Sequence, residues 1–181
     1  MYKTKTKNTL LIAASLLACG TFASVDAGAR EHSRSVQRTA HQGSVSVTRD
    51  NARFESQRQR DWQRDGEGNA SMTRSRTITG ANGGTAERQG STERNADGSL
   101  THENTNSVTN ANGGTLQADG SFTRDADGNV TGSHDTTATN KNGATYEGST
   151  TWSDGQVTHT GTCTNAAGAT VDCPKRSTDG N

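Results

Sequence analysis

The sequence has little of what a compact core requires. Hydrophobic residues make up 27% of the 181 residues and aromatic residues only 4%. A typical soluble domain is about 45–50% apolar with glycine counted, a share that this chain does not reach even with its 21 glycines. Because apolar burial is the dominant favourable term in folding, a thick core is excluded. We therefore predict that the chain is neither a compact α/β nor an α+β enzyme domain, and that it is not an enzyme.

Proline, cysteine and net charge are also scarce. The single proline, Pro174, argues against a secreted disordered linker, which would usually carry more proline. Three cysteines supply too few closely spaced N and S ligands for a zinc site. The 19 basic and 19 acidic residues cancel, so overall charge does not identify a partner. There is no G-x-S-x-G motif for a nucleophilic serine.

The N-terminal residues have the pattern of a targeting segment. Lys3, Lys5 and Lys7 precede the uncharged run 9–18, which is too short for a membrane-spanning helix of about 20 residues. Small residues follow, with cleavage sites ending at Ala23 or Ala27. We predict that 1–27 is a bacterial secretory signal peptide and that the mature chain has no transmembrane helix.

A second processing route stays open at Cys19. Residues 16–19, Leu-Leu-Ala-Cys, resemble a bacterial lipobox, in which the cysteine is lipidated and becomes the first residue. A protein that carries several acyl chains is held stably at a membrane. A protein that is only cleaved after its signal peptide is released from the membrane. The predicted location is therefore periplasmic or extracellular, with a lipid-anchored protein on a bacterial membrane as the alternative.

Two cysteines remain near the C-terminus of the exported chain. Cys163 and Cys173 are symmetric about Gly168, where a hairpin turn would bring them opposite each other. An even pair in an exported protein indicates a disulfide. We expect this bridge to close the last hairpin, followed by a disordered tail over 174–181.

The central region contains an internal repeat of about 30 residues. Asn-Gly pairs recur at 82–83, 112–113 and 142–143, and Asp-Gly pairs interleave at 97–98, 127–128 and 154–155. These dipeptides are strong hairpin signals, because glycine adopts the positive φ of tight turns. The runs between them are rich in Thr, of which the chain has 29, and Thr favours strands.

The repeat predicts an all-β fold. We expect residues 68–173 to form an antiparallel meander of β-hairpin repeats, about 30 residues each, with a thin core or none. Gly113, in a turn, should then resist replacement by valine. Gly132 lies inside a strand run, so valine should be tolerated there because it favours strands.

Residues 28–67 fit the repeat poorly. They are rich in arginine with interleaved acidic residues, and we predict an irregular or disordered N-terminal segment. Val45 and Val47 alternate with serines and indicate one strand, whereas 51–63 has no clear period and is expected to be a loop or short helix. The arginines of residues 30–94 offer contacts to an anionic surface such as a polysaccharide, lipopolysaccharide or nucleic acid. Interleaved acidic residues cancel much of their field, and a solvated face of mixed charge is the alternative.

The turn motifs resemble those of a loose group of small secreted bacterial proteins. Residues 80–85, Gly-Ala-Asn-Gly-Gly-Thr, and 126–128, Ala-Asp-Gly, carry the likeness, which covers about residues 65–173. These proteins pair a signal peptide with G-x-N-G-G-T and A-D-G turn repeats. The resemblance implies an exported β-repeat protein and brings no activity or cofactor with it.

Two sets of side chains are candidates for binding a metal. Asp125, Asp127 and Asn129 resemble the start of a calcium loop, although the twelfth position is a threonine rather than glutamate. His102 and His159 share a register in the repeat, with His134 two positions further along its own. A hairpin turn for the first set and exposed imidazoles for the second are the alternatives.

The expected function is an exported, non-enzymatic β-repeat protein of the cell envelope or medium with a structural or adhesive role. Its partners would be further copies of the chain or an envelope polysaccharide. The alternative is a periplasmic or surface binding module for a divalent metal or an anionic polymer.

Overall fold

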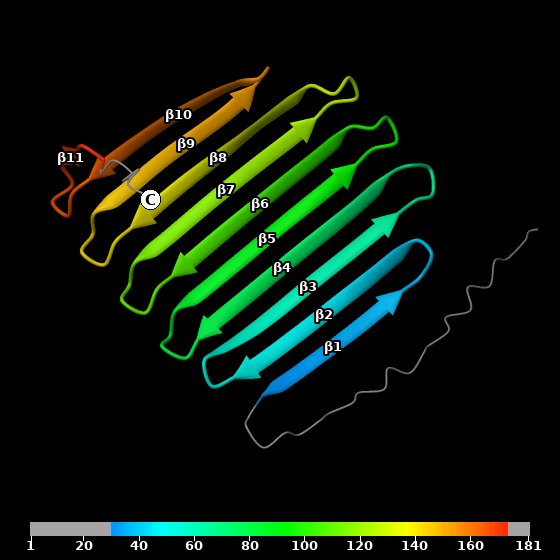
Figure 1. Cartoon of the computed structure of the whole chain (residues 1–181), viewed down its shortest axis with the longest axis horizontal. Coiled ribbons are helices and arrows are strands. Elements are labelled where there is room, and N and C mark those ends of the chain that lie inside the picture. Colours follow the sequence, from blue (N-terminus) through cyan, green and yellow to red (C-terminus); the bar gives the residue numbers. More distant parts are fainter. Residues whose placement is uncertain (1–29, 174–181) are drawn as a thin grey trace, which may run out of the picture.

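The described part of the chain is a single antiparallel sheet. A computed structural model describes residues 30–173; the predicted signal peptide, Cys19 and the tail 174–181 lie outside the described residues. The strands are β1 (Glu31–Arg38), β2 (Gln42–Asn51), β3 (Phe54–Arg64), β4 (Ala70–Gly80), β5 (Thr85–Arg94), β6 (Leu100–Thr109), β7 (Thr115–Arg124), β8 (Val130–Thr139), β9 (Thr145–Ser153), β10 (Gln156–Thr164) and β11 (Thr170–Val171). Their order in the sheet follows the chain (Figure 1). The predicted all-β meander is confirmed.

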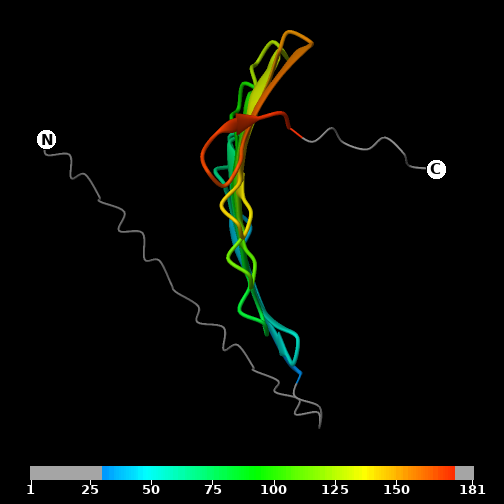
Figure 2. The same cartoon turned by 90° about the vertical axis from the view of Figure 1, so that its left-hand side faces the viewer.

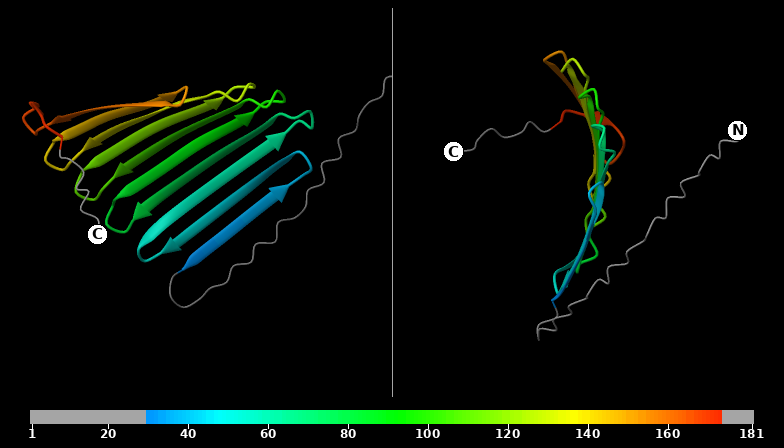
Figure 3. Two further views of the ribbon diagram at one scale, coloured as in Figure 1. Left: turned by 45° about the horizontal axis from the view of Figure 1, so that its top comes forward. Right: turned by 90° about the vertical axis from the view of Figure 1, so that its right-hand side faces the viewer.

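The sheet is one layer thick. Seen from the side it is a thin, curved ribbon of strands with no second layer packed on it (Figures 2 and 3). Within residues 30–173, only Ser56, Gly114, Ala118 and Cys163 are buried, and no side chain is fully buried. The expectation of a thin core or none is confirmed. The ladder hydrogen bonds and cross-strand side-chain pairs therefore hold the described fold together.

The prediction of an irregular segment over 28–67 is wrong for residues 31–64, which form β1, β2 and β3. The strand predicted at Val45 and Val47 lies within β2. The first two connections lack glycine and are closed by side chains instead. The Thr39 hydroxyl accepts the Gln42 N–H at 3.1 Å, and the Asn51 side-chain carbonyl accepts the Arg53 N–H at 2.9 Å.

Most later hairpins use a three-residue loop. In the loop between β6 and β7, the Gly113 N–H donates to the Asn110 carbonyl at 3.0 Å and the Asn110 N–H donates to the Gly114 carbonyl at 2.8 Å. Gly113 has a φ of 83°, as a type I turn followed by a left-handed glycine requires. The side-chain carbonyl of Asn110 also accepts the Gly114 N–H at 2.9 Å. The predicted turn glycine is confirmed.

One loop differs, and it explains the break in the repeat. Ser153 pairs with Gln156, which leaves a two-residue turn of Asp154 and Gly155. Both residues have positive φ, 53° and 75°, the requirement of a type I′ turn. This shorter connection accounts for an Asp-Gly spacing of 27 rather than 30 residues.

The predicted disulfide is present. Cys163 and Cys173 are bonded, with 5.2 Å between their Cα atoms, and the hairpin turns at Gly168, whose φ is 80°. Cys163 lies opposite Val171 rather than opposite Cys173, because the three-residue loop shifts the centre of the hairpin. The bridge therefore ties the segment after β11 back to β10.

Candidate functional site: an arginine face

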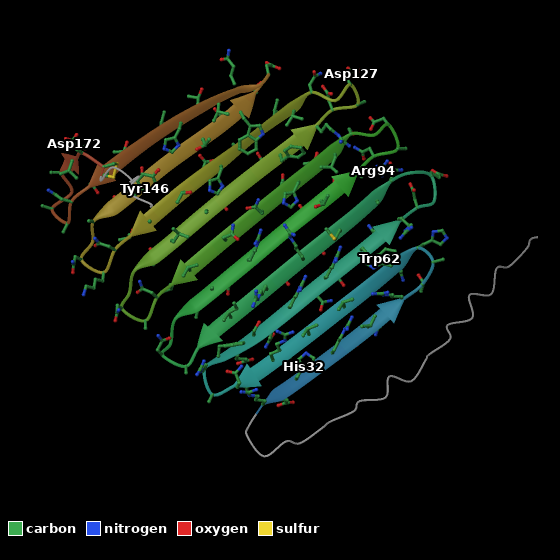
Figure 4. The ribbon with its side chains drawn as sticks, in the orientation of Figure 1. His32, Trp62, Arg94, Asp127, Tyr146 and Asp172 are labelled. Carbon is green, nitrogen blue, oxygen red and sulfur yellow. A yellow bond between two sulfur atoms is a disulfide. The ribbon has the colours of Figure 1, made fainter. Side chains whose placement is uncertain are left out.

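The strand register separates the basic and acidic residues onto opposite faces of the sheet. Successive residues of a strand point to opposite faces, and directly paired residues share one. We call the face that carries Trp62 the arginine face; Figure 4 labels His32, Trp62, Arg94 and Tyr146 on it. Among the described strands it carries no carboxylate. Its arginines are Arg34, Arg38, Arg49, Arg58, Arg60, Arg64, Arg74, Arg76, Arg88, Arg94 and Arg124.

The opposite face, here called the acidic face, consists only of Ser, Thr, Gln, Asp and Glu in the described strands. It carries no Arg, Lys, His or apolar residue there. Its carboxylates are Glu31, Asp50, Glu55, Asp61, Glu87, Glu93, Glu103, Asp119, Asp135 and Glu147. The zero net charge of the sequence therefore conceals a separation of charge between the two faces of the described strands.

The arginines gather on the first five strands. Arg58, Arg76 and Arg88 lie directly opposite one another on β3, β4 and β5, and Arg60 lies opposite Arg74. Like charges in this position destabilise a sheet. An anion bound across these strands would neutralise the repulsion.

Glycines inside strands make room for large side chains on the arginine face. A Cβ on Gly43 would lie 2.5 Å from Nε1 of Trp62, and a Cβ on Gly132 would overlap the Trp152 ring. Each indole thus lies over the backbone of the strand paired with its own. The expectation that Gly132 tolerates valine is wrong, because the site is already filled by Trp152.

A groove of about 860 Å³ lies at one end of strands β1 to β6 on this face. Arg38, Arg60, Arg64 and Arg94 are among its lining residues, together with Trp62. The Arg64 guanidinium carbon lies 4.9 Å from the Trp62 ring centroid, within the range of a cation–π contact. The groove can accept an anionic group between its arginines.

The predicted calcium loop is a hairpin loop between β7 and β8. Asp125 accepts hydrogen bonds from the side chain and the backbone N–H of Asn129, at 2.7 and 2.8 Å. These bonds lower the pKa of Asp125 below its usual range, because they favour the charged form. The carboxylate is therefore already engaged within its own loop.

The three histidines are not brought together. His102, His134 and His159 lie on β6, β8 and β10, so one strand lies between each and the next, and two inter-strand spacings of about 4.8 Å put them roughly 10 Å or more apart. Each contacts a threonine hydroxyl instead, as His102 Nδ1 does with Thr92 at 2.8 Å. Over residues 30–173, no three His, Cys, Asp or Glu side chains gather at a distance suited to a metal ion.

The sequence interpretation missed the separation of charge because it followed apolar residues alone. In 55–64, acidic residues occupy odd positions and Arg and Trp occupy even positions, a clear period of two. The same sorting by parity recurs in every charged strand. Reading charge as well as hydropathy at a period of two would have predicted both β3 and the arginine face.

No protein-family model, curated protein or solved structure matches this chain. The described residues contain no helix long and apolar enough to cross a membrane.

Proposed function

We propose that this is an exported, non-enzymatic protein that adheres to an acidic polysaccharide of the cell envelope through its arginine face. The observation that carries the proposal is the set of eleven strand arginines on one face without a carboxylate beside them. The proposal combines the two functions expected from the sequence, an adhesive role and binding to an anionic polymer.

Arginine suits the proposed ligand. Its planar guanidinium forms paired hydrogen bonds with carboxylate, sulfate or phosphate groups and gives up its hydration more readily than lysine does. Ten of the eleven arginines lie on β1 to β5, a patch roughly 19 Å across by 34 Å along the strands. A charge distribution of that size fits several residues of a polymer rather than one small anion.

The sparse aromatic residues favour a polysaccharide over a nucleic acid. Single-stranded nucleic acids are bound by successive aromatic platforms along a basic groove. Here the groove holds Trp62 alone, and Phe122 and Trp152 lie in the same row but four and six strands away. Continuous stacking of neighbouring bases is therefore not supported, whereas contacts to repeated acidic groups are.

Export rests on the disulfide together with the N-terminal sequence. The Cys163–Cys173 bond is typical of oxidising compartments, and the sequence of 1–27 has the pattern of a secretory signal. The proposed location is the periplasm or the medium. Lipidation at Cys19 would instead hold the arginine face at a membrane surface.

Binding to polygalacturonate at several salt concentrations tests the proposal. We expect affinity to fall steeply as salt rises, because binding releases counterions. The triple variant R58Q/R76Q/R88Q should lose roughly tenfold or more and show a shallower salt dependence. The control is E87Q/E93Q on β5, which changes only the acidic face and should bind at least as tightly as the parent.

Equal losses for the two variants would overturn the proposal, since the face would then be irrelevant. Tighter binding to poly(dT) than to polygalacturonate at the same salt would also overturn it, in favour of nucleic acid. Circular dichroism of both variants must match that of the parent, which separates loss of binding from loss of fold.

A further inference from the structure

The acidic face complements the arginine face of the same chain. One face presents eleven strand arginines and no carboxylate, and the other presents ten carboxylates and no basic residue. We propose that copies of this protein stack face to back, with the arginine face of one copy on the acidic face of the next. This goes beyond polysaccharide binding, because it gives the acidic face a partner.

Adjacent residues of opposite charge set the register of the stack. Arg49-Asp50, Arg60-Asp61, Glu87-Arg88 and Glu93-Arg94 are neighbours within strands. Neighbours in a strand point to opposite faces, so each pair places a cation and an anion back to back through the sheet. A second copy shifted by about 10 Å along the sheet normal, the usual distance between packed sheets, therefore puts each arginine above the carboxylate of its own pair.

Histidines continue the same pattern in the rest of the sheet. His32 follows Glu31, Glu103 follows His102, and Asp135 follows His134. Such adjacent pairs therefore occur on β1, β2, β3, β5, β6 and β8, and a single translation aligns all of them. A two-fold pairing of arginine faces would instead oppose like charges.

The shape of the sheet permits this contact. The described chain is one curved layer (Figures 2 and 3), so its two faces curve in opposite senses and a second copy nests against the first. Ten strands at about 4.8 Å and about 34 Å of strand length give a face of roughly 1,600 Å². About 800 Å² per partner is enough for a standard specific interface. Val36, Val108 and Leu116, exposed by 37–39% on the arginine face, would be covered.

Because the two contacting surfaces differ, the contact is heterologous, and because successive copies are related by a translation, it does not close into a ring. Each copy leaves one free arginine face and one free acidic face at the ends of the stack, so assembly is open-ended. The free arginine face at one end remains available to a polysaccharide. Polymer in excess should therefore cap or dissolve the stacks.

Two variants of opposite faces provide the decisive test. R58Q/R76Q/R88Q removes arginines from β3 to β5, and E87Q/E93Q/E103Q removes carboxylates from β5 and β6. Sedimentation velocity of the parent should show species larger than a monomer at about 20 mM salt and monomers at about 500 mM, where screening is strong. Each variant alone should be at least tenfold weaker in assembly than the parent.

The equimolar mixture of the two variants distinguishes stacking from other association. The acidic face of the first variant and the arginine face of the second are both intact, so the mixture should form heterodimers that grow no further. A parent that is monomeric at low salt, a mixture without heterodimers, or unchanged assembly of the acidic-face variant would each overturn the proposal. Polygalacturonate binding by E87Q/E93Q/E103Q is expected to persist, so failure of stacking and failure of polysaccharide binding are distinguishable.

Discussion

The two faces of this sheet are built from the same strands and share only Ser and Thr. The arginine face holds all the arginines, histidines, aromatic residues, aliphatic residues and glycines of the strands, with a few Asn, Ser and Thr, whereas the acidic face holds only Ser, Thr, Gln, Asp and Glu. The comparison shows that average composition describes neither face. A neutral and hydrophilic chain can present a purely cationic surface when its charges alternate with the period of a strand.

The faces also differ in how they are packed. The arginine face combines large side chains with glycines on adjacent strands, as Trp152 does with Gly132. The acidic face is more uniform. At one end of the strands, a row of eight paired threonines crosses the sheet from β4 to β11. Two of them, Thr145 and Thr164, have hydroxyl oxygens 2.5 Å apart. The ladder threonines are Thr79, Thr85, Thr109, Thr115, Thr139, Thr145, Thr164 and Thr170. Tolerance to substitution should therefore be much lower on the arginine face.

The largest expected effect comes from Gly132→Val, which tests this difference in packing directly. The new side chain would overlap the Trp152 ring and the Ser121 carbonyl, and overpacking of this kind costs about 3 kcal/mol. Thr131→Val, next to it on the acidic face, should change the free energy of unfolding by less than about 0.5 kcal/mol. Urea denaturation of both variants measures the contrast.

Gly113→Val serves as a reference for the same experiment. Its Cβ meets no atom within 4 Å, so only the positive φ is costly, and we expect a loss of about 1 kcal/mol. If Gly132→Val destabilised the protein less than Gly113→Val, the aromatic cover of the strand glycines would be of no energetic importance.

Arg76→Gln should have a smaller effect of the opposite sign. Arg76 lies between Arg58 and Arg88 without a carboxylate on its face, so its removal relieves repulsion and should stabilise the sheet by about 0.5–1 kcal/mol at low salt. The gain should shrink as salt screens the charges. Thermal unfolding at two salt concentrations measures it, and a loss of stability at low salt would show that the arginines support the fold.

The smallest expected effect is at the loops, where the two faces meet. The hydrogen bonds from Asn129 lower the pKa of Asp125 in the folded state. The ionised Asp125 side chain therefore contributes fully to folding stability above its pKa in the unfolded chain, about 3.9. This contribution is lost as pH falls through its lower pKa in the folded protein. Because the carboxylate is exposed, we expect only local opening, seen as faster amide exchange at Asn129 in acid. Asp125→Asn should abolish this pH dependence, and an unchanged dependence in that variant would assign it to other carboxylates.

Sequence reasoning recovered the parts of the fold that local chemistry determines. The Asn-Gly and Asp-Gly pairs located the hairpins of the repeat, and Cys163 and Cys173 indicated the bridge. β1 and β3 were missed, and β2 was recovered only at Val45 and Val47, because the first two turns use Thr39 and Asn51 in place of glycine. The groove around Trp62 could not be predicted, because it depends on which residues of neighbouring strands pair, and that register follows only from the complete set of loop lengths.

The strict order of the meander has a consequence for how the chain acquires its structure. Every strand contacts only the strands before and after it in the sequence, so no strand pairing waits for a distant segment. Such local connectivity permits rapid folding, and arrays of this kind can grow from any completed unit. A chain that emerges gradually, from a ribosome or a translocation channel, can add one hairpin at a time to an existing edge. The Cys163–Cys173 bond lies at the end of the described chain that emerges last, so its oxidation fastens an array that has already formed.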